Sequence, residues 1–167
     1  QSTGRRVFRT SYVSDARSNC VPPLFVGDIV SQSDGKSKFV PCQPGEDKGE
    51  EQLRVWLMPD NEQHLRDRYI VTVDVGGTSN KADYSCIVVA DRIAMTDGGV
   101  PEIVACWHGH IEHDKLAWKA MEIARAYDNA LLVIEANTLE TEGTEGDNFE
   151  YILNEISGRY SNLYCRT

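Results

Sequence analysis

The chain has 167 residues, 41% of them hydrophobic and 26% charged, which is enough apolar sequence for one domain with a buried core. Its 26 acidic residues outnumber its 17 basic residues, and the net charge of −9 excludes a stand-alone nucleic-acid binder that holds phosphates with a basic face. No apolar run is long enough to span a membrane, and no signal peptide is expected before the first strand. The five cysteines form no C-x-x-C pair, which argues against a disulfide framework and favours a reducing, cytosolic setting.

Residues 1–52 are poorly periodic and rich in Ser, Gly, Pro and Asp, so we expect a linker or an N-terminal extension with short strands. The expected pieces are extended segments at 5–12 and 24–30 and turns at 31–37 and 44–50. Residues 53–57 alternate between apolar and polar and stop at Met58-Pro59, which predicts a strand and a turn. The core domain is predicted to occupy residues 53–167.

Hydrophobic periodicity predicts five strands in this core, at residues 69–75, 83–91, 102–111, 131–136 and from 162 onward. Cys86 and Cys106 fall within these apolar patterns and are predicted to be small core residues. A tight turn is expected at Gly76-Gly77, and a hairpin loop at residues 97–99.

Two helices are predicted, one after the third strand and one at about 148–156. Asp114 is expected to be the N-cap of the first helix. Its buried face is expected to hold Leu116, Ala120, Ile123, Ala124 and Tyr127. Short loops make the first three strands antiparallel, whereas each helix returns the chain for parallel pairing. The order predicts an α/β fold with a ribonuclease H-like mixed sheet flanked by helices.

Two of the predicted strands end on a carboxylate. Residues 69–73 are apolar or β-branched and lead to Asp74, and residues 131–134 lead to Glu135. A charge is costly within a strand that is buried on both faces, so an acid is expected only at its exit, where water or a cation can meet it. Two carboxylates at one edge of a sheet predict a divalent-metal site, which indicates metal-dependent chemistry on phosphodiesters. The alternative for Asp74 is a cap on the Gly-Gly turn.

Other polar residues receive the plainer interpretation. Asp83 is balanced between assisting the metal site and simply starting a strand, and Asn137 is expected in a turn. His108, His110 and His113 suggest zinc, but no complete ligand set accompanies them apart from Glu112, so a polar outer strand face is expected. The acidic run 140–150 is predicted to be a flexible loop over the site. Arg166 by itself indicates little about phosphate binding.

Several stretches together resemble the nuclease domain of the large terminase subunit of tailed phages. They are Asp74-Val-Gly-Gly after a strand, Ala82-Asp83-Tyr84-Ser85 before the next, Tyr127-Asp-Asn-Ala before Leu-Val-Ile-Glu135-Ala-Asn137, and Leu163-Tyr164-x-Arg166, with Val55-Trp56 and Pro59 upstream. The resemblance covers residues 53 to 167, and the combination is much more specific than any one piece.

The resemblance implies a Mg²⁺- or Mn²⁺-dependent endonuclease, a hydrolase of a phage or prophage that cuts concatemeric DNA during genome packaging with two metal ions. Asp74 matches the first metal carboxylate, Glu135 the second, and Asp83 an acid that can assist. The third carboxylate is expected beyond Thr167, so the core is predicted to be incomplete at its C-terminal end, to bind metal poorly and to cut slowly or not at all.

The implied partners are double-stranded DNA, the ATPase motor domain of the same parent chain, the small terminase subunit and the portal protein, in the host cytoplasm and without a membrane. The motor half of this family would carry a G-x-x-x-x-G-K-[ST] loop that cradles phosphates. That motif does not occur in this sequence, so this chain is not expected to be the ATPase.

Three other interpretations compete. Asp74-Val-Gly-Gly-Thr78 also resembles the phosphate-binding hairpin of sugar and acetate kinases of the actin superfamily, but no second phosphate loop recurs. A Holliday-junction resolvase would share the core and its acids, yet it would be a compact basic dimer. A catalytically incomplete ribonuclease H-like docking module would need no cation site at all.

Overall fold

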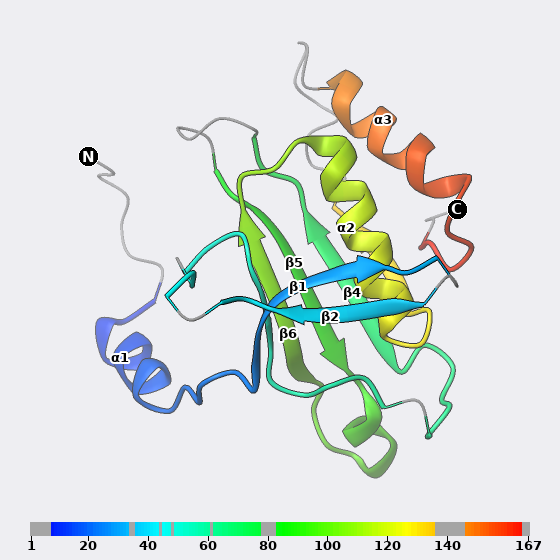
Figure 1. The fold of residues 1–167 in the computed structure, drawn as a ribbon. Coiled ribbons are helices and arrows are strands. Elements are labelled where there is room, and N and C mark those ends of the chain that lie inside the picture. The colour runs from blue at the N-terminus through cyan, green and yellow to red at the C-terminus, as the bar shows by residue number, and fades with distance from the viewer. Residues whose placement is uncertain are drawn as a thin grey trace.

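A computed structural model describes residues 8–33, 36–43, 45–47, 49–60, 62–77, 83–135 and 146–164, the last segment from 152 onward with side chains (Figure 1). The elements in chain order are α1 (Thr10–Ser18), β1 (Phe25–Ser31), β2 (Ser37–Pro41), β3 (Leu53–Val55), β4 (Tyr69–Asp74), β5 (Ser85–Asp91), the 3₁₀ helix η1 (Ile93–Asp97), β6 (Glu102–Gly109), α2 (His113–Ala126), β7 (Leu131–Ile134) and α3 (Gly146–Ser157).

The strands form one sheet in the order β2-β1-β3-β6-β5-β4-β7. β7 is parallel to β4, and the other pairs are antiparallel. Leu163 adds an isolated parallel bridge to Leu132 on the far side of β7. The series β6-β5-β4-β7 with Leu163 at its end is the predicted arrangement of three antiparallel strands followed by parallel ones. The ribonuclease H-like mixed sheet is therefore confirmed.

Alternation of buried and exposed residues determines which face of β4 meets the core. Tyr69, Val71 and Val73 are buried, whereas Thr72 and Asp74 on the other face are exposed. Helix α2 covers the buried face, and the five residues predicted for it, of which Tyr127 is the C-cap, all have 0% exposure. Ile152 and Ile156 of α3 belong to the same core, and α3 packs beside α2. The core therefore lies on one side of the sheet.

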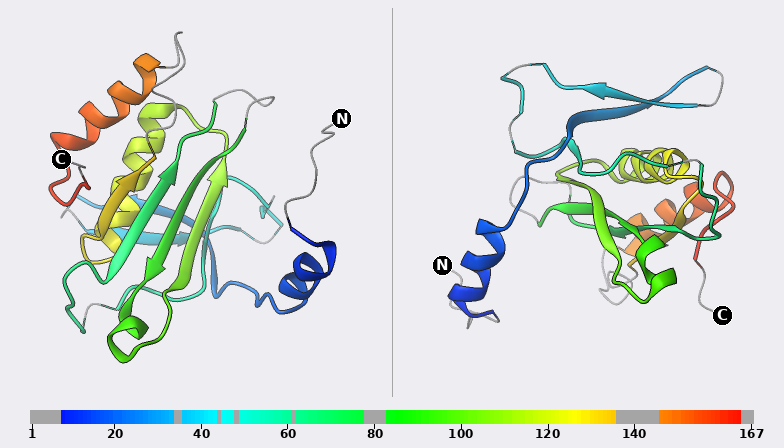
Figure 2. Two further views of the ribbon diagram at one scale, coloured as in Figure 1. Left: turned by 180° about the vertical axis from the view of Figure 1, so that it is seen from behind. Right: turned by 90° about the horizontal axis from the view of Figure 1, so that it is seen from below.

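The β1–β2 hairpin lies over α2, so the helix is enclosed between the hairpin and strands β4 to β6 (Figure 2, right). Ser31 Oγ donates to the Glu122 carboxylate at 2.7 Å, and Lys119 forms an ion pair with Asp28. Among the described strands, β3 joins the hairpin to the rest of the sheet, through the pairs Arg54–Cys106 and Val55–Ala105 with β6.

No helix among the described residues covers the opposite face of β4, β5 and β6, which is seen directly in Figure 2, left. We call this the open face. It carries Thr72, Asp74, Cys86, Val88 and Cys106, all half-buried or exposed. The prediction that Cys86 and Cys106 are core residues is therefore wrong, because their strand positions are out of phase with the buried ones.

Several local predictions are also wrong. The extended segment expected at 5–12 overlaps α1, a helix with no buried residue and therefore no apolar stripe to reveal it. Strand β2 was not predicted, since pairing with β1 rather than an apolar pattern holds it. Glu112, not Asp114, is the N-cap of α2, and Asp114 lies in its first turn, where a carboxylate still favours the helix dipole. The fifth strand is reduced to the bridge at Leu163.

A candidate active site at the edge of the sheet

Asp74 and Glu135 lie at the carboxyl ends of two neighbouring parallel strands. Asp74 is the last residue of β4, and Glu135 follows the last residue of β7. Val73 pairs with Ile134, and the Glu135 N–H donates to the Val73 carbonyl at 2.9 Å. Both residues are exposed. The structure thus brings the two carboxylates to one edge of the sheet.

Both residues line one pocket of about 420 Å³ on the open face. Its other lining residues are Thr72, Val73, Cys86, Val88 and Val133. The walls are mostly apolar, and none of the described residues that line the pocket is a lysine or arginine. Two carboxylates that line one pocket concentrate negative charge there, which attracts a positive ion.

The Asp74 carboxylate makes no hydrogen bond or ion pair with any residue that the structure describes. The turn after Asp74 is held by the backbone instead. The Gly77 N–H donates to the Asp83 carbonyl at 3.1 Å, and the Gly76 N–H donates to Ser85 Oγ at 3.0 Å. A Cβ on Gly76 would lie 2.3 Å from the Asp83 carbonyl oxygen, so only glycine fits there. The predicted turn therefore fixes the strand end, while the carboxylate makes no hydrogen bond or ion pair with the described residues.

Asp83 is exposed and lies beside this turn, but it does not line the pocket. Within the described ranges, no group of three or more His, Cys, Asp or Glu side chains is placed to hold a metal. The structure thus brings together two of the three predicted metal residues. Ser85, which is fully buried and contacts the turn, was not singled out from the sequence, although it lies in the Ala82-Asp83-Tyr84-Ser85 stretch.

Cys86 faces Asp74 across β4 and β5 and extends the pocket toward β6. A hydrogen bond from the Cys106 thiol lowers the pKa of Cys86 to about 7, although burial and the nearby Asp74 carboxylate act in the opposite direction. The same contact raises the pKa of Cys106. The open face therefore carries a thiol pair immediately beside the acids.

The three histidines do not converge on one point. His108 pairs with Cys86 across β5 and β6, and both His108 and His110 contact the ring of Tyr84. His113 Nε2 lies 3.2 Å from the Gly76 carbonyl oxygen. Asn137, residues 140–145 and Arg166 lie outside the described residues, whereas residues 146–150 of the acidic run begin α3 rather than a loop.

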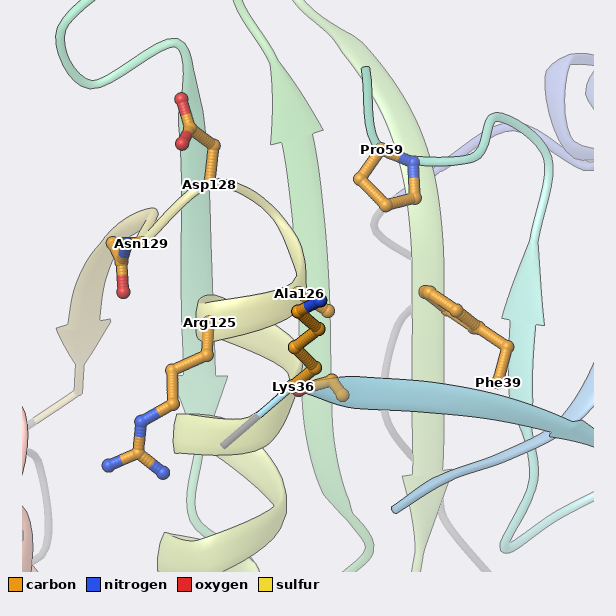
Figure 3. A pocket seen from close by; sticks show the side chains of 8 residues that line it. Lys36, Phe39, Pro59, Arg125, Ala126, Asp128 and Asn129 are labelled. Carbon is orange, nitrogen blue, oxygen red and sulfur yellow. The ribbon is translucent and has the colours of Figure 1, made fainter. Parts of the chain in front are cut away.

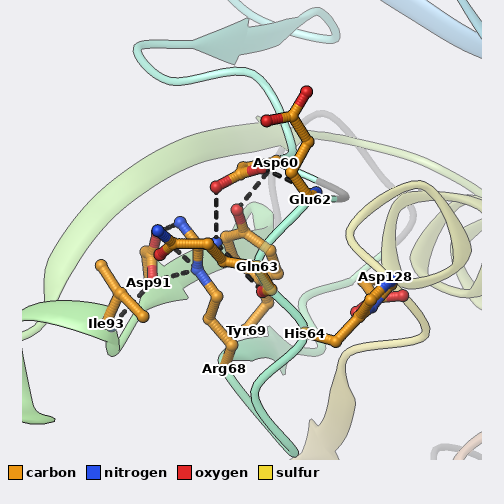
Figure 4. A network of polar contacts seen from close by, with 9 residues as sticks. All are labelled: Asp60, Glu62, Gln63, His64, Arg68, Tyr69, Asp91, Ile93 and Asp128. Atoms are coloured by element: carbon orange, nitrogen blue, oxygen red, sulfur yellow. Dashed lines mark hydrogen bonds and ion pairs between the residues drawn. The ribbon is translucent and has the colours of Figure 1, made fainter.

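A second acidic region lies at the end of the β4–β5 pair opposite to Asp74 (Figure 4). Asp91, the last residue of β5, is 2% exposed, and Arg68 beside it is 6% exposed. Arg68 Nη2 donates to Asp91 Oδ2 at 2.9 Å, and Arg68 Nη1 donates to Asp60 Oδ2 at 2.9 Å. The Arg68 hydrogen bond holds the pKa of Asp60 below its usual value. The carboxylates of this region are paired with a buried arginine, and the sequence analysis did not predict this pairing.

A separate pocket of about 460 Å³ lies between the β1–β2 hairpin and the end of α2 (Figure 3). It is lined by Lys36, Ser37, Phe39, Pro59, Arg125, Ala126, Asp128 and Asn129. Its charges are mixed, and it contains none of the predicted site residues.

No protein-family model and no curated protein matches the sequence. Solved structures that are similar to the chain include two large terminase nucleases. One is the large terminase nuclease from thermophilic phage G20c with bound magnesium, at 17% identity and a TM-score of 0.47, over 67% of this chain and 48% of that one. The other is the large terminase nuclease of the same phage, at 15% identity and a TM-score of 0.43, over 68% and 50%.

The chain thus spans about half the length of these structures, which carry the name of the family that the sequence resembles. Among its described helices, none is both long and apolar enough to cross a membrane.

Proposed function

We propose that this chain is the metal-dependent DNA endonuclease domain of a phage terminase large subunit. The observation that carries the proposal is the pair Asp74 and Glu135, which leaves adjacent parallel strands and lines one pocket. The stretches around both acids are also the ones that resemble this family. The proposed activity is hydrolysis of a phosphodiester bond in concatemeric DNA during genome packaging.

The residues in the pocket fit a hard divalent cation. Mg²⁺ is commonly held by one or two carboxylates and several waters, and both acids offer exposed oxygen ligands. Asp74 has no competing partner among the described residues. Asp74 and Glu135 would hold the ion, and the proposed second ion would need further ligands, with Asp83 and a carboxylate beyond Thr167 as the candidates. A bound ion would lower the pKa of a coordinated water and stabilise charge on the phosphoryl oxygens.

The chain's own residues would position the reaction. The backbone contacts of Gly76 and Gly77 with Ser85 and Asp83 hold the end of β4, which keeps the Asp74 carboxylate directed at the pocket edge. Val88 and Val133 form an apolar wall beneath the acids. The substrate strand would approach from the open face, since α2 covers the other side of the sheet.

Affinity for DNA would come largely from elsewhere. The net charge is −9, and no basic residue lines the described part of the pocket, so counterion release would contribute little here. The ATPase motor domain of the same parent chain is the proposed source of this affinity, with the small terminase subunit and the portal as further partners in the host cytoplasm.

Nicking of supercoiled plasmid in Mg²⁺ or Mn²⁺ tests the proposal. This chain is compared with a form extended at the C-terminus by about 100 residues, the size of a further small domain. Cleavage is expected from the extended form and abolished by chelation or by Asp74→Asn. Asp97→Asn, a change at an exposed acid of η1 outside the pocket, is the matched control and should cut like the wild type. Absence of cleavage by both forms, or equal cleavage by the Asp74 variant, would contradict the proposal.

A further inference from the structure

An exposed tyrosine ring is held in place beside the acid pocket. Tyr84 immediately precedes β5 and is 46% exposed. Its hydroxyl donates to the Glu50 carboxylate at 2.7 Å. The ring centroid lies 4.4 Å from that of His110, with planes tilted by 38°, and 5.6 Å from that of His108 in an edge contact. Three contacts thus fix the position of an aromatic side chain that is exposed to solvent.

The ring and the acids lie in register on the sheet. His108 pairs with Cys86, and Cys86 pairs with Asp74, so the three residues form a row across β6, β5 and β4. With strands about 4.8 Å apart, the His108 end of the row lies roughly 10 Å from Asp74. Tyr84 precedes Cys86, on the middle strand of this row, by two residues, so it lies on the same face of the sheet as Asp74.

The charge around the ring restricts what it would bind. Glu50 contacts Tyr84, and Glu51 lies against Gly109 at the end of β6. The Glu50 hydrogen bond also raises the pKa of Tyr84, so the phenol stays neutral. A phosphate would be repelled by these carboxylates. A nucleobase would not be, because it is flat and uncharged, and stacking on an aromatic ring needs no positive charge.

We infer that Tyr84, supported by His108 and His110, is a stacking platform for an unpaired base of the substrate strand near the bond cut at Asp74 and Glu135. The inference rests on the proposed function for the identity of the substrate. It specifies that the site receives a locally single-stranded segment, and that Tyr84 is a positioning residue rather than a metal ligand. Single-strand binding as a whole weakens with salt, but stacking is not ionic, so the fold-loss on removing the ring should be similar at low and high salt.

Binding of a short single-stranded oligonucleotide, with 2-aminopurine as the base analogue, tests the platform in EDTA, where no cleavage takes place. Stacking quenches the fluorescence of this base, and the titration is repeated at low and high salt. Tyr84→Ala is expected to weaken binding by about 5- to 100-fold, as loss of one stacked base does. Tyr84→Phe keeps the ring and should bind within about threefold of the wild type. Tyr12→Ala removes another exposed ring, 62% exposed on α1, and should have no effect.

The inference is overturned if the wild type does not quench the probe, if Tyr84→Ala binds as tightly as the wild type, or if Tyr84→Phe loses as much affinity as Tyr84→Ala. The last result would assign the effect to the hydrogen bond with Glu50. Thermal unfolding of each variant shows whether it is folded. Since the titration needs neither metal nor cleavage, failure of the platform is distinguishable from failure of the nuclease, which the plasmid assay reports.

Discussion

The two ends of the β4–β5 pair each carry an aspartate, and the protein treats them in opposite ways. Asp91 is 2% exposed and bonded to the buried Arg68, whereas Asp74 is exposed and has no partner in the part of the chain that the structure describes. A buried carboxylate needs a cation from the protein. An exposed one that lines a pocket with a second acid can take a cation from solution. The contrast separates a structural carboxylate from a functional one within a single hairpin.

The Asp91 end of the β4–β5 pair, here called the closed end, should contribute most to the free energy of unfolding. Arg68→Met leaves Asp91 buried without its cation, and breaking a buried pair from one side costs about 3–5 kcal/mol. Urea denaturation would measure the loss. Arg66→Met is the matched control, since the Arg66 side chain is 96% exposed, and its effect should stay within about 0.5 kcal/mol. Equal stability of the two variants would mean that the Arg68 pair contributes nothing.

The Asp74 end of the β4–β5 pair, here called the open end, should contribute most to metal binding. Asp74→Asn removes one of the two oxygen ligands in the pocket, and we expect at least about a tenfold loss of Mg²⁺ or Mn²⁺ affinity. Isothermal titration calorimetry would measure it, with Asp97→Asn as a control that binds like the wild type. Equal affinity in the wild type and the Asp74 variant would remove Asp74 from the site.

The closed end should also respond to acid. The Arg68 hydrogen bond, and then that from the Glu62 N–H, lowers the folded-state pKa of Asp60, so its ionised form stabilises the fold above the unfolded value of about 3.9. That contribution is lost as the pH falls through the lowered pKa. Asp60→Asn should therefore be less stable than the wild type at pH 7, and the difference should vanish in strong acid. A difference that grows on acidification would reverse the assigned sign.

The smallest effect is expected for Asp74→Asn on stability, within about 0.5 kcal/mol of the wild type, because an exposed carboxylate without protein partners contributes little to folding. The urea midpoint is the measurement. A loss comparable with that of Arg68→Met would show that Asp74 is structural, and the contrast between the two ends would disappear.

Sequence reasoning located the open end because Asp74 and Glu135 each follow an apolar run, a pattern that is local in the chain. It missed the closed end because the partner of Asp91 is selected by register. Tyr69 pairs with Asp91, which brings the preceding Arg68 against a carboxylate 23 residues away. No local pattern encodes such a contact.

The same reasoning explains the other successes and failures. The face of α2 was predictable, since its buried residues recur at helical spacing. Strand β2 was not predictable, because it forms by pairing with β1. Helix α1 was not predictable either, because no apolar stripe marks it in the sequence. The Tyr84 cluster needed three segments, around residues 50, 84 and 108–110, to come together.

Strand β3 is only three residues long, yet among the described strands it is the one that joins the hairpin to the rest of the sheet. The hairpin is otherwise held by contacts with α2, among them the Ser31–Glu122 hydrogen bond and the Lys119–Asp28 ion pair, so local opening of the hairpin would break these contacts while β4 and β7 stay paired. Such opening would uncover the outer side of α2 without moving Asp74 or Glu135. The β1–β2 hairpin, which can open locally, is therefore separate from the β4–β7 pair, which has to keep the two carboxylates in register.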